Sequence, residues 1–400
     1  MSGGKFINKS YVGTIDALTK GTVTKVQNAN YVFNDKPPVV CDSWYNQNKE
    51  ATTFDEGTRS EYVTLGKQSP IKFNKIKDAI FYSSGIKIEF DVQYEEDGLG
   101  VSNMPNIGGI VLPNTWTPYS GDYFTYKHAG KNWLYKVTSV SFDTIDNGNN
   151  IWKFEASCDN YGIEQIEKQV VENYNMIINN VGTSFNAIIK EENYNAIDKL
   201  DGILTSLKDY YIALFYNDRL QTFTYKGYYG NLYDPYMIEF LMRNNILSGS
   251  SEYIYVNHEV PMPRTFVIEY DKSYFRALET NTIDLFNNNI CTAPIIDNQY
   301  SLFYTVKEDY YMIDYNRRGL EEFQTLDSEL VSRIKEDNEY DDDSLKSSYN
   351  IIIKYFNKKE LGSNMIPLLE DMKFTESSSM FYSIPMIIYI IESSIKNLMK

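Results

Sequence analysis

The amino-acid sequence predicts an α+β protein, in which an N-terminal arm and a small antiparallel β sandwich or barrel precede a larger, mainly helical domain. Three observations lead to this prediction. Apolar and polar residues alternate between residues 51 and 160, as in half-buried strands. The apolar spacing changes to three and four residues near Tyr161, as in amphipathic helices. The chain of 400 residues is also long enough for two or three domains.

The first 50 residues show no clear period. Thr, Asn, Lys and Gly dominate them up to the pair Pro37 and Pro38, and one strand is predicted at residues 22–26. We expect an extended arm over residues 1–50, of the kind that often lies along a neighbouring subunit in an assembly.

The β-rich module is predicted over residues 51–160. Its clearest strand covers residues 85–94, where apolar side chains at every second position alternate with charged or polar ones. Gly, Pro and Asn residues mark turns between this strand and the next ones. The further strands are predicted at residues 108–112, 122–126, 133–142 and 151–156.

Helical spacing dominates residues 161–400. Ile163, Ile166, Val170, Tyr174 and Ile177 predict a first helix, which Asp159 or Asn160 would cap. Residues 250–275 alternate again and predict some strands. Four further helices are predicted at residues 194–216, 236–246, 344–356 and 385–399, the last with Pro385 in its first turn.

The C-terminal helix is apolar on nearly every side. Its longest apolar run, residues 380–391, is shorter than the ~20 residues that span a bilayer, so we expect no membrane span. A helix without a polar face is buried, either in the domain core or in a partner subunit. We favour the core, and keep Phe381, Ile387 and Ile391 as interface candidates for the second case.

The composition is rich in tyrosine and acidic residues. The chain contains 35 Tyr and 21 Phe, which suits surfaces that become buried on assembly, although the codon usage of a low-GC genome explains the excess equally well. The net charge of −16 opposes binding to phosphate backbones and anionic membranes. We expect no sequence-specific nucleic-acid partner.

Motifs of known chemistry are missing from the sequence. It contains no GxxxxGK[ST], no GxSxG and no CxxC, and neither His128 nor His258 stands at a zinc-ligand spacing. The N-terminus has no apolar segment typical of a signal peptide. The acidic run at residues 336–343 lacks the central Gly and closing Glu of a calcium loop, so we interpret it as a solvated loop. We expect no enzyme, no cofactor and no metal.

Trp116 is the best candidate for an exposed aromatic residue, because it lies between two prolines in the loop segment PNTWTP. An exposed Trp stacks on a sugar ring or anchors a protein contact. Of these two roles, we favour the protein contact.

One part of the chain resembles a known kind of module. The segments LPNTWTPYSGDYFTY at residues 112–126, WLYKVTSV at 133–140 and IWKFEA at 151–156 resemble the β-rich modules of neck, tail and baseplate proteins from phages of low-GC hosts. In those modules a proline-bearing strand end leads to GDYF and then to an aromatic hairpin ending in KVTxV. The resemblance covers about residues 110–156 and implies no catalytic residue.

This resemblance implies a structural virion protein that is assembled in the host cytoplasm. Its expected partners are other copies of itself, in a ring or another symmetric assembly, and other virion proteins. Trp116, Tyr119 and Tyr123 are the interface candidates in the matching segment. The alternative is a tail-associated protein that binds or depolymerises host-surface carbohydrate, and a cytosolic enzyme of an unrecognised family comes third.

Overall fold

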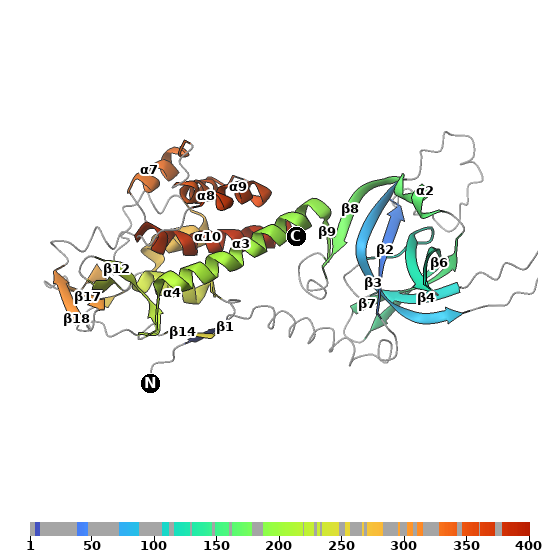
Figure 1. Ribbon diagram of the computed structural model, residues 1–400, viewed down its shortest axis with the longest axis horizontal. Helices are drawn as coiled ribbons and strands as arrows, with labels where there is room; N and C mark the ends of the chain where they lie inside the picture. The colour runs from blue at the N-terminus through green and yellow to red at the C-terminus, as the bar shows by residue number, and fades with distance from the viewer. Residues whose placement is uncertain are drawn as a thin grey trace, which may run out of the picture. The chain divides into compact units, whose positions relative to one another are not determined.

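The computed structural model divides into two compact units, which are described separately (Figure 1). The barrel unit comprises residues 15–195 with Met399 and Lys400, and the helical unit comprises residues 1–14 and 196–398. The described residues are 5–8, 38–46, 72–87, 106–111, 116–128, 130–145, 149–159, 162–177, 187–218, 220–227, 230–232, 234–247, 253–256, 266–267, 270–282, 295–296, 302–306, 310–314, 328–341, 346–359, 361–372 and 378–400.

The barrel unit is built on a closed, six-stranded antiparallel β-barrel. The strand order is β2-β5-β6-β7-β4-β3, and pairing of β3 with β2 closes the ring, which leaves the barrel without a free edge between these strands. The predicted α+β fold is therefore confirmed, with a barrel as its β part. The six strands are β2 (Pro38–Asn46), β3 (Phe73–Lys87), β4 (Asn106–Val111), β5 (Tyr123–His128), β6 (Lys131–Ile145) and β7 (Asn149–Cys158).

The long strand β3 changes partners at a bulge. Asp78 has a positive φ of 57° and lies where the pairing with β2 shifts register. Before the bulge, β3 pairs in parallel with β8 (Val170–Met176), which in turn pairs with β9 (Ile188–Lys190). After the bulge, β3 pairs with β4. One strand thereby serves both the barrel and the extension formed by β8 and β9.

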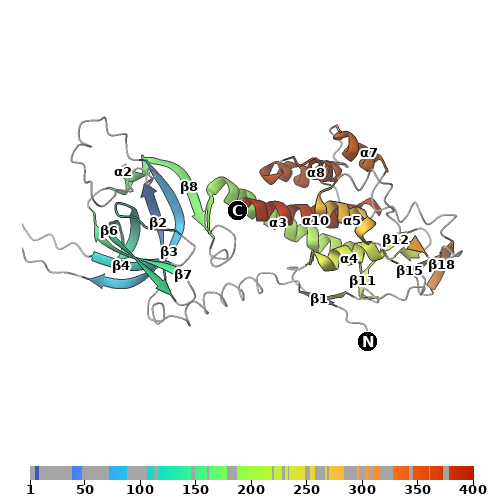
Figure 2. The same cartoon turned by 180° about the vertical axis from the view of Figure 1, so that it is seen from behind.

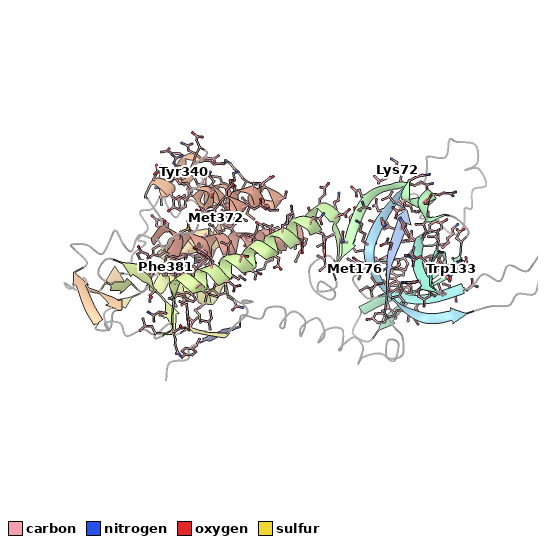
Figure 3. All side chains as sticks on the ribbon, viewed as in Figure 1. Lys72, Trp133, Met176, Tyr340, Met372 and Phe381 are labelled. Atoms are coloured by element: carbon pink, nitrogen blue, oxygen red, sulfur yellow. The ribbon has the colours of Figure 1, made fainter. Side chains whose placement is uncertain are left out.

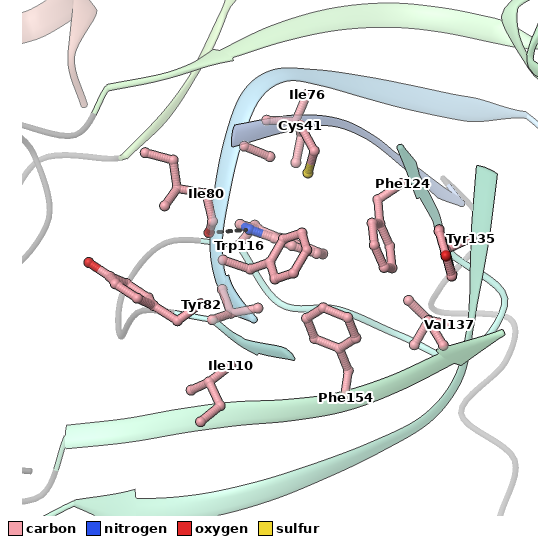
Figure 4. Close-up of a cluster of buried hydrophobic side chains, with 14 of the residues drawn as sticks. Cys41, Ile76, Ile80, Tyr82, Ile110, Trp116, Phe124, Tyr135, Val137 and Phe154 are labelled. Carbon is pink, nitrogen blue, oxygen red and sulfur yellow. Dashed lines mark hydrogen bonds between the residues drawn. The ribbon is translucent and has the colours of Figure 1, made fainter. Parts of the chain in front are cut away.

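Aromatic rings fill the barrel (Figure 4). The ring of Phe154 lies 5.3 Å, centroid to centroid, from the rings of both Phe81 and Phe124, and Phe124 stacks on Tyr135 at 5.6 Å. Gly109 faces this cluster, and a Cβ atom there would lie 2.4 Å from Cζ of Phe154. The rings therefore use the space that any other residue at position 109 would need.

A second, smaller cluster lies under the short helix α2 (Ile163–Glu167). Trp44, Phe73, Leu134 and Ile166 are buried there together. The ammonium group of Lys75 lies 5.2 Å from the ring of Trp44 and pairs with carboxylates of Asp42, at 2.9 Å, and Glu167, at 2.6 Å. These contacts link β2, β3 and α2 beside the buried cluster.

The helical unit surrounds α10 (Ser378–Leu398), which is buried along most of its length (Figures 1 and 2). Its contacts with α3 include Tyr211 stacked on Phe381 at 6.2 Å and an ion pair of Lys208 with Glu392 at 2.7 Å. The remaining helices are α3 (Glu191–Phe215), α4 (Pro235–Arg243), α5 (Tyr274–Thr280), α7 (Ser328–Glu336), α8 (Ser347–Phe356) and α9 (Met365–Glu370), with 3-10 turns η4 (Tyr270–Lys272) and η6 (Gly362–Asn364).

Short strands complete the helical unit. They form the pair β1 (Lys5–Asn8) and β14 (Tyr253–Val256), the pair β10 (Tyr216–Asn217) and β11 (Thr222–Phe223), the pair β15 (Phe266–Val267) and β16 (Ile295–Ile296), and a sheet of β12 (Tyr225–Gly227), β13 (Gly230–Leu232), β17 (Leu302–Val306) and β18 (Tyr310–Asp314). The predicted strands near 250–275 correspond to β14 and β15, whereas β17 and β18 were not predicted.

Several expectations from the sequence are corrected. The predicted helix from Tyr161 to Ile177 is helical only in α2, after Gly162 and not after Asp159 or Asn160, and then becomes β8. The two β-branched residues that open β8 favour the strand, and pairing with β3 stabilises it. Pro38–Asn46, expected in the arm, is a barrel strand. The predicted strand at 22–26 and most of that at 85–94 lie outside the described residues.

The C-terminal helix begins earlier than predicted. It starts at Ser378, so Pro385 lies inside the helix and not in its first turn. Burial of Met380, Phe381 and Tyr382 stabilises the turn before the proline, which offsets the cost of one missing N–H group. Phe381, Ile387 and Ile391 are 1%, 0% and 0% exposed, so these side chains belong to the core of this chain, the case that the sequence favoured.

Candidate functional site

The exposed large apolar side chains among the described residues all lie in the barrel unit. They are Val40, Tyr119, Trp133, Phe142 and Val171. The three aromatic ones come from β6 and from the turn before β5, and Figure 3 shows Trp133 on the barrel. Exposed aromatic residues on a rigid sheet are typical anchors of protein contacts, so the β5–β6 hairpin, together with the turn that precedes β5, is the candidate interaction surface.

The turn before β5 holds Tyr119 in place. The Asp122 carboxylate accepts a hydrogen bond from the Tyr119 amide at 2.9 Å, and the amide of Gly121 donates to the carbonyl of Val137 on β6 at 2.8 Å. Gly121 has a φ of 95°, which an L side chain rarely adopts. The Tyr119 side chain is nevertheless 46% exposed. A fixed backbone beneath an exposed ring lowers the entropy that binding would cost.

Tyr123, the third residue of the GDYF motif, is half-buried. Its ring makes an edge contact with Phe73 at 5.7 Å, and the ammonium group of Lys136 lies 5.8 Å from its centroid. Tyr123 is thus a support of the hairpin surface with only part of its ring accessible.

Several polar groups lie near Tyr119, both in its own turn and on the neighbouring strand β6. The Ser120 hydroxyl donates to the carbonyl of Thr138 at 3.1 Å, and the Thr138 hydroxyl donates to the carbonyl of Glu155 on β7 at 3.1 Å. Ser139, just past a bulge in β6, donates to the Glu155 carboxylate at 3.3 Å. An aromatic anchor with polar neighbours is the arrangement that protein interfaces use.

Trp133 and Phe142 lie near the two ends of β6. They lie nine positions apart in the strand, which corresponds to roughly 30 Å, so they belong to different contact points. Phe142 packs edge-on against Trp152 of β7 at 4.9 Å and is still 51% exposed. The hairpin therefore presents aromatic groups along its length, and not in one patch.

Trp116 does not belong to this surface. It is 3% exposed, its indole N–H donates to the carbonyl of Ile80 at 3.3 Å, and its ring lies 6.2 Å from that of Phe154 (Figure 4). The expectation of an exposed loop aromatic was wrong, because the Trp116 side chain belongs to the buried cluster of the barrel core. The sequence could not show this, since flanking prolines mark a loop without giving its direction.

The described residues offer little reactive chemistry. They contain no group of three or more His, Cys, Asp or Glu side chains that could hold a metal ion. Cys41 and Cys158 are buried thiols whose pKa is raised by burial, so neither is activated as a nucleophile. Glu339, in the acidic run, pairs with Lys354 at 3.3 Å and Lys359 at 2.8 Å. Within the described ranges, every helix falls short of what a membrane crossing requires.

Comparison of the chain with models of known families, with curated proteins and with solved structures finds no match. The fold thus defines an α+β protein with a closed barrel, and the exposed aromatic side chains of the described residues lie on β6 and in the turn before β5.

Proposed function

We propose that the chain is a structural component of a phage particle, in the head–tail connector or neck, the tail or the baseplate, and that it acts through repeated protein contacts. The observation that carries this proposal is the β5–β6 hairpin. It presents Tyr119, Trp133 and Phe142 to solvent, and it comes from the segment that resembles phage neck, tail and baseplate modules. The net charge of −16 fits a part that assembles by protein contacts and not on nucleic acid.

The carbohydrate-binding alternative loses the residue on which it depended. A sugar platform requires an accessible ring face, and the Trp116 ring lies inside the barrel core. Tight retention of the wild-type chain on host cell-wall polysaccharide would contradict the proposal and restore the alternative.

Mass spectrometry of density-purified particles tests the proposal directly. The chain should be present at a fixed copy number per particle and should be labelled at one position by antibody in electron micrographs. Particles of normal composition that lack the chain would overturn the proposal.

The variant Tyr119→Ser tests the hairpin surface. Because the ring is exposed, we expect an unchanged unfolding midpoint and a loss of incorporation into particles. Val171→Thr is the matched control, since Val171 is 52% exposed on β8, outside the hairpin. Normal incorporation of Tyr119→Ser would exclude Tyr119 as an anchor.

A further inference from the structure

The β5–β6 hairpin is positively charged, although the chain as a whole is strongly acidic. Residues 123–142, which cover β5 and most of β6, contain Lys127, Lys131 and Lys136 but no Asp or Glu, whereas 54 of the 400 residues of the chain are acidic. All three lysines are exposed. The exposed Trp133 therefore lies in a segment whose charge is opposite in sign to the net charge of −16.

These three lysines differ from the lysines of β3 in their surroundings. Lys75 and Lys77 both form ion pairs with carboxylates of neighbouring elements. Among the described residues, no carboxylate forms an ion pair with Lys127, Lys131 or Lys136. Their ammonium groups are thus available to the charges of a partner.

The turn of the hairpin brings two of these lysines together with Trp133. Lys127 pairs with Asn132 across the two strands, and Lys131 and Trp133 stand on either side of Asn132. Gly130 has a φ of 77°, which suits the tight turn between β5 and β6. Successive side chains alternate between the faces of a strand, so Lys131 and Trp133 share one face and Lys127 lies on the other. Because only the backbone separates the two faces, one partner surface can contact these side chains together.

The barrel holds the end of the hairpin on a fixed backbone. Leu134, next to Trp133, packs in the buried cluster under α2, and Tyr135 packs in the barrel core. Both side chains are at most 4% exposed. The charges and the indole ring are therefore positioned before binding, which lowers the entropy that an association costs.

We propose that the end of the β5–β6 hairpin docks on an acidic protein surface of a neighbouring component of the particle. Carboxylates of that surface pair with Lys127 and Lys131, and an apolar pocket beside them receives the ring of Trp133. This inference rests on the proposed function, because the partner is another protein of the same particle. It adds the charge and the shape of the surface that the hairpin recognises.

Nucleic acid is the other anionic partner that a basic and aromatic surface fits. A protein that is held by phosphates makes on the order of 6–10 phosphate contacts, whereas the hairpin offers three lysines. The net charge of −16 also repels a phosphate backbone, whose charge density is high. A protein surface with a few carboxylates matches a few lysines, so charge complementarity favours the protein partner.

Charge reversal in the full-length chain tests the docking. The pair Lys127→Glu with Lys131→Glu should keep the unfolding midpoint, because both side chains are exposed. It should lower the number of copies per particle at least about tenfold, because like charges then face one another. The neutral pair Lys127→Gln with Lys131→Gln should give a smaller loss in the same assay.

Lys72→Glu with Lys199→Glu is the matched control. Both lysines are exposed and form no ion pair with a described residue, and the two reversals change the net charge by the same amount. Lys199 belongs to α3, and Lys72 lies apart from Trp133 on the barrel unit (Figure 3). We expect normal incorporation of this control.

Second-site suppressors identify the chemistry of the partner. Phages that carry the reversed pair are passaged until assembly returns, and we expect substitutions of Asp or Glu in another particle protein, since these remove the repulsion. Normal incorporation of the reversed pair would overturn the docking. Binding of a single-stranded oligonucleotide by the wild-type chain, lost in the reversed pair, would assign the hairpin end to nucleic acid and also overturn it.

The failure of the docking and the failure of the proposed function give different results. If only the docking is wrong, the wild-type chain and the reversed pair are both present in particles at the same copy number. If the proposed function is wrong, the wild-type chain is absent from particles, and the docking fails with it.

Discussion

Replacing Gly109 with alanine tests the packing of the barrel core. A Cβ atom at this position would lie 2.4 and 2.6 Å from two ring atoms of Phe154 and 2.8 Å from Cδ2 of Phe81. Phe154 cannot simply move away, because the rings of Phe124 at 5.3 Å and Trp116 at 6.2 Å lie against it. The added methyl group must therefore shift several rings at once.

The expected cost lies at the upper end of the range for overpacked cores, which is about 1–3 kcal/mol. All four Trp residues lie in the barrel unit, so the fluorescence of tryptophan during denaturant unfolding reports on the barrel alone. We expect a lower midpoint with an unchanged slope. Gly202→Ala is the matched control. Its Cβ meets nothing within 4 Å on the exposed face of α3, so it should gain up to about 1 kcal/mol in the helical signal and leave the fluorescence midpoint unchanged.

The double variant Gly109→Ala with Phe154→Leu separates a steric clash from a general loss of stability. A smaller residue at position 154 makes room for the methyl group, so the two changes should couple favourably by about 0.5–3 kcal/mol. A loss below about 0.5 kcal/mol for Gly109→Ala alone, or strict additivity in the double variant, would refute this account of the core.

Three further predictions concern the helical unit. Burial raises the pKa of Asp234 to about 6, so the folded state binds a proton more tightly than the unfolded state does. The free energy of unfolding should therefore fall as the pH rises from about 4 to 6. Asp234→Asn, which keeps a helix cap, should remove up to about 3 kcal/mol of this fall in denaturant unfolding measured across the pH range. Lys208→Met should cost up to about 3 kcal/mol by calorimetry, because it removes the ion-pair partner of the largely buried Glu392 carboxylate and leaves only the more distant Lys396, whereas adding Glu392→Leu should restore most of the loss. Truncation after Ser379 should abolish soluble expression, and a folded truncated chain would contradict the core position of α10.

Periodicity predicted the regular elements well where one period holds over many residues. The strands β4 to β7 and the helices α3, α4, α8 and α10 follow from the spacing or the length of their apolar segments. The seven residues of β8 fit both the strand period and the helix period, because some of their apolar side chains are two positions apart and others are four positions apart. Only pairing with β3 decides in favour of the strand, and long-range pairing cannot be seen in a local pattern.

The candidate surface was predicted in part. The GDYF motif begins two residues after the exposed Tyr119, whereas Trp116 and Tyr119, three residues apart, have opposite environments at 3% and 46% exposure. The Trp116 side chain belongs to the buried cluster of the barrel core, whereas the Tyr119 side chain does not, and a local sequence pattern does not show which side chains enter that core. Trp133 and Phe142 were expected in strands, and their exposure follows from their positions near the two ends of β6.

The large number of aromatic residues supports a role in assembly less strongly once their burial in the structure is considered. Among the described residues, fully buried aromatic side chains are numerous in both units, and they include Tyr135, Phe124 and Phe81 in the barrel and Tyr211, Tyr236 and Phe240 in the helical unit. Only Tyr119, Trp133 and Phe142 are exposed among the large aromatic side chains described. Most described aromatic residues thus stabilise the two cores, where each contributes roughly 1.5–3 kcal/mol of burial. The case for a protein interface therefore depends on three identified side chains on one hairpin, and substitution of each can test it.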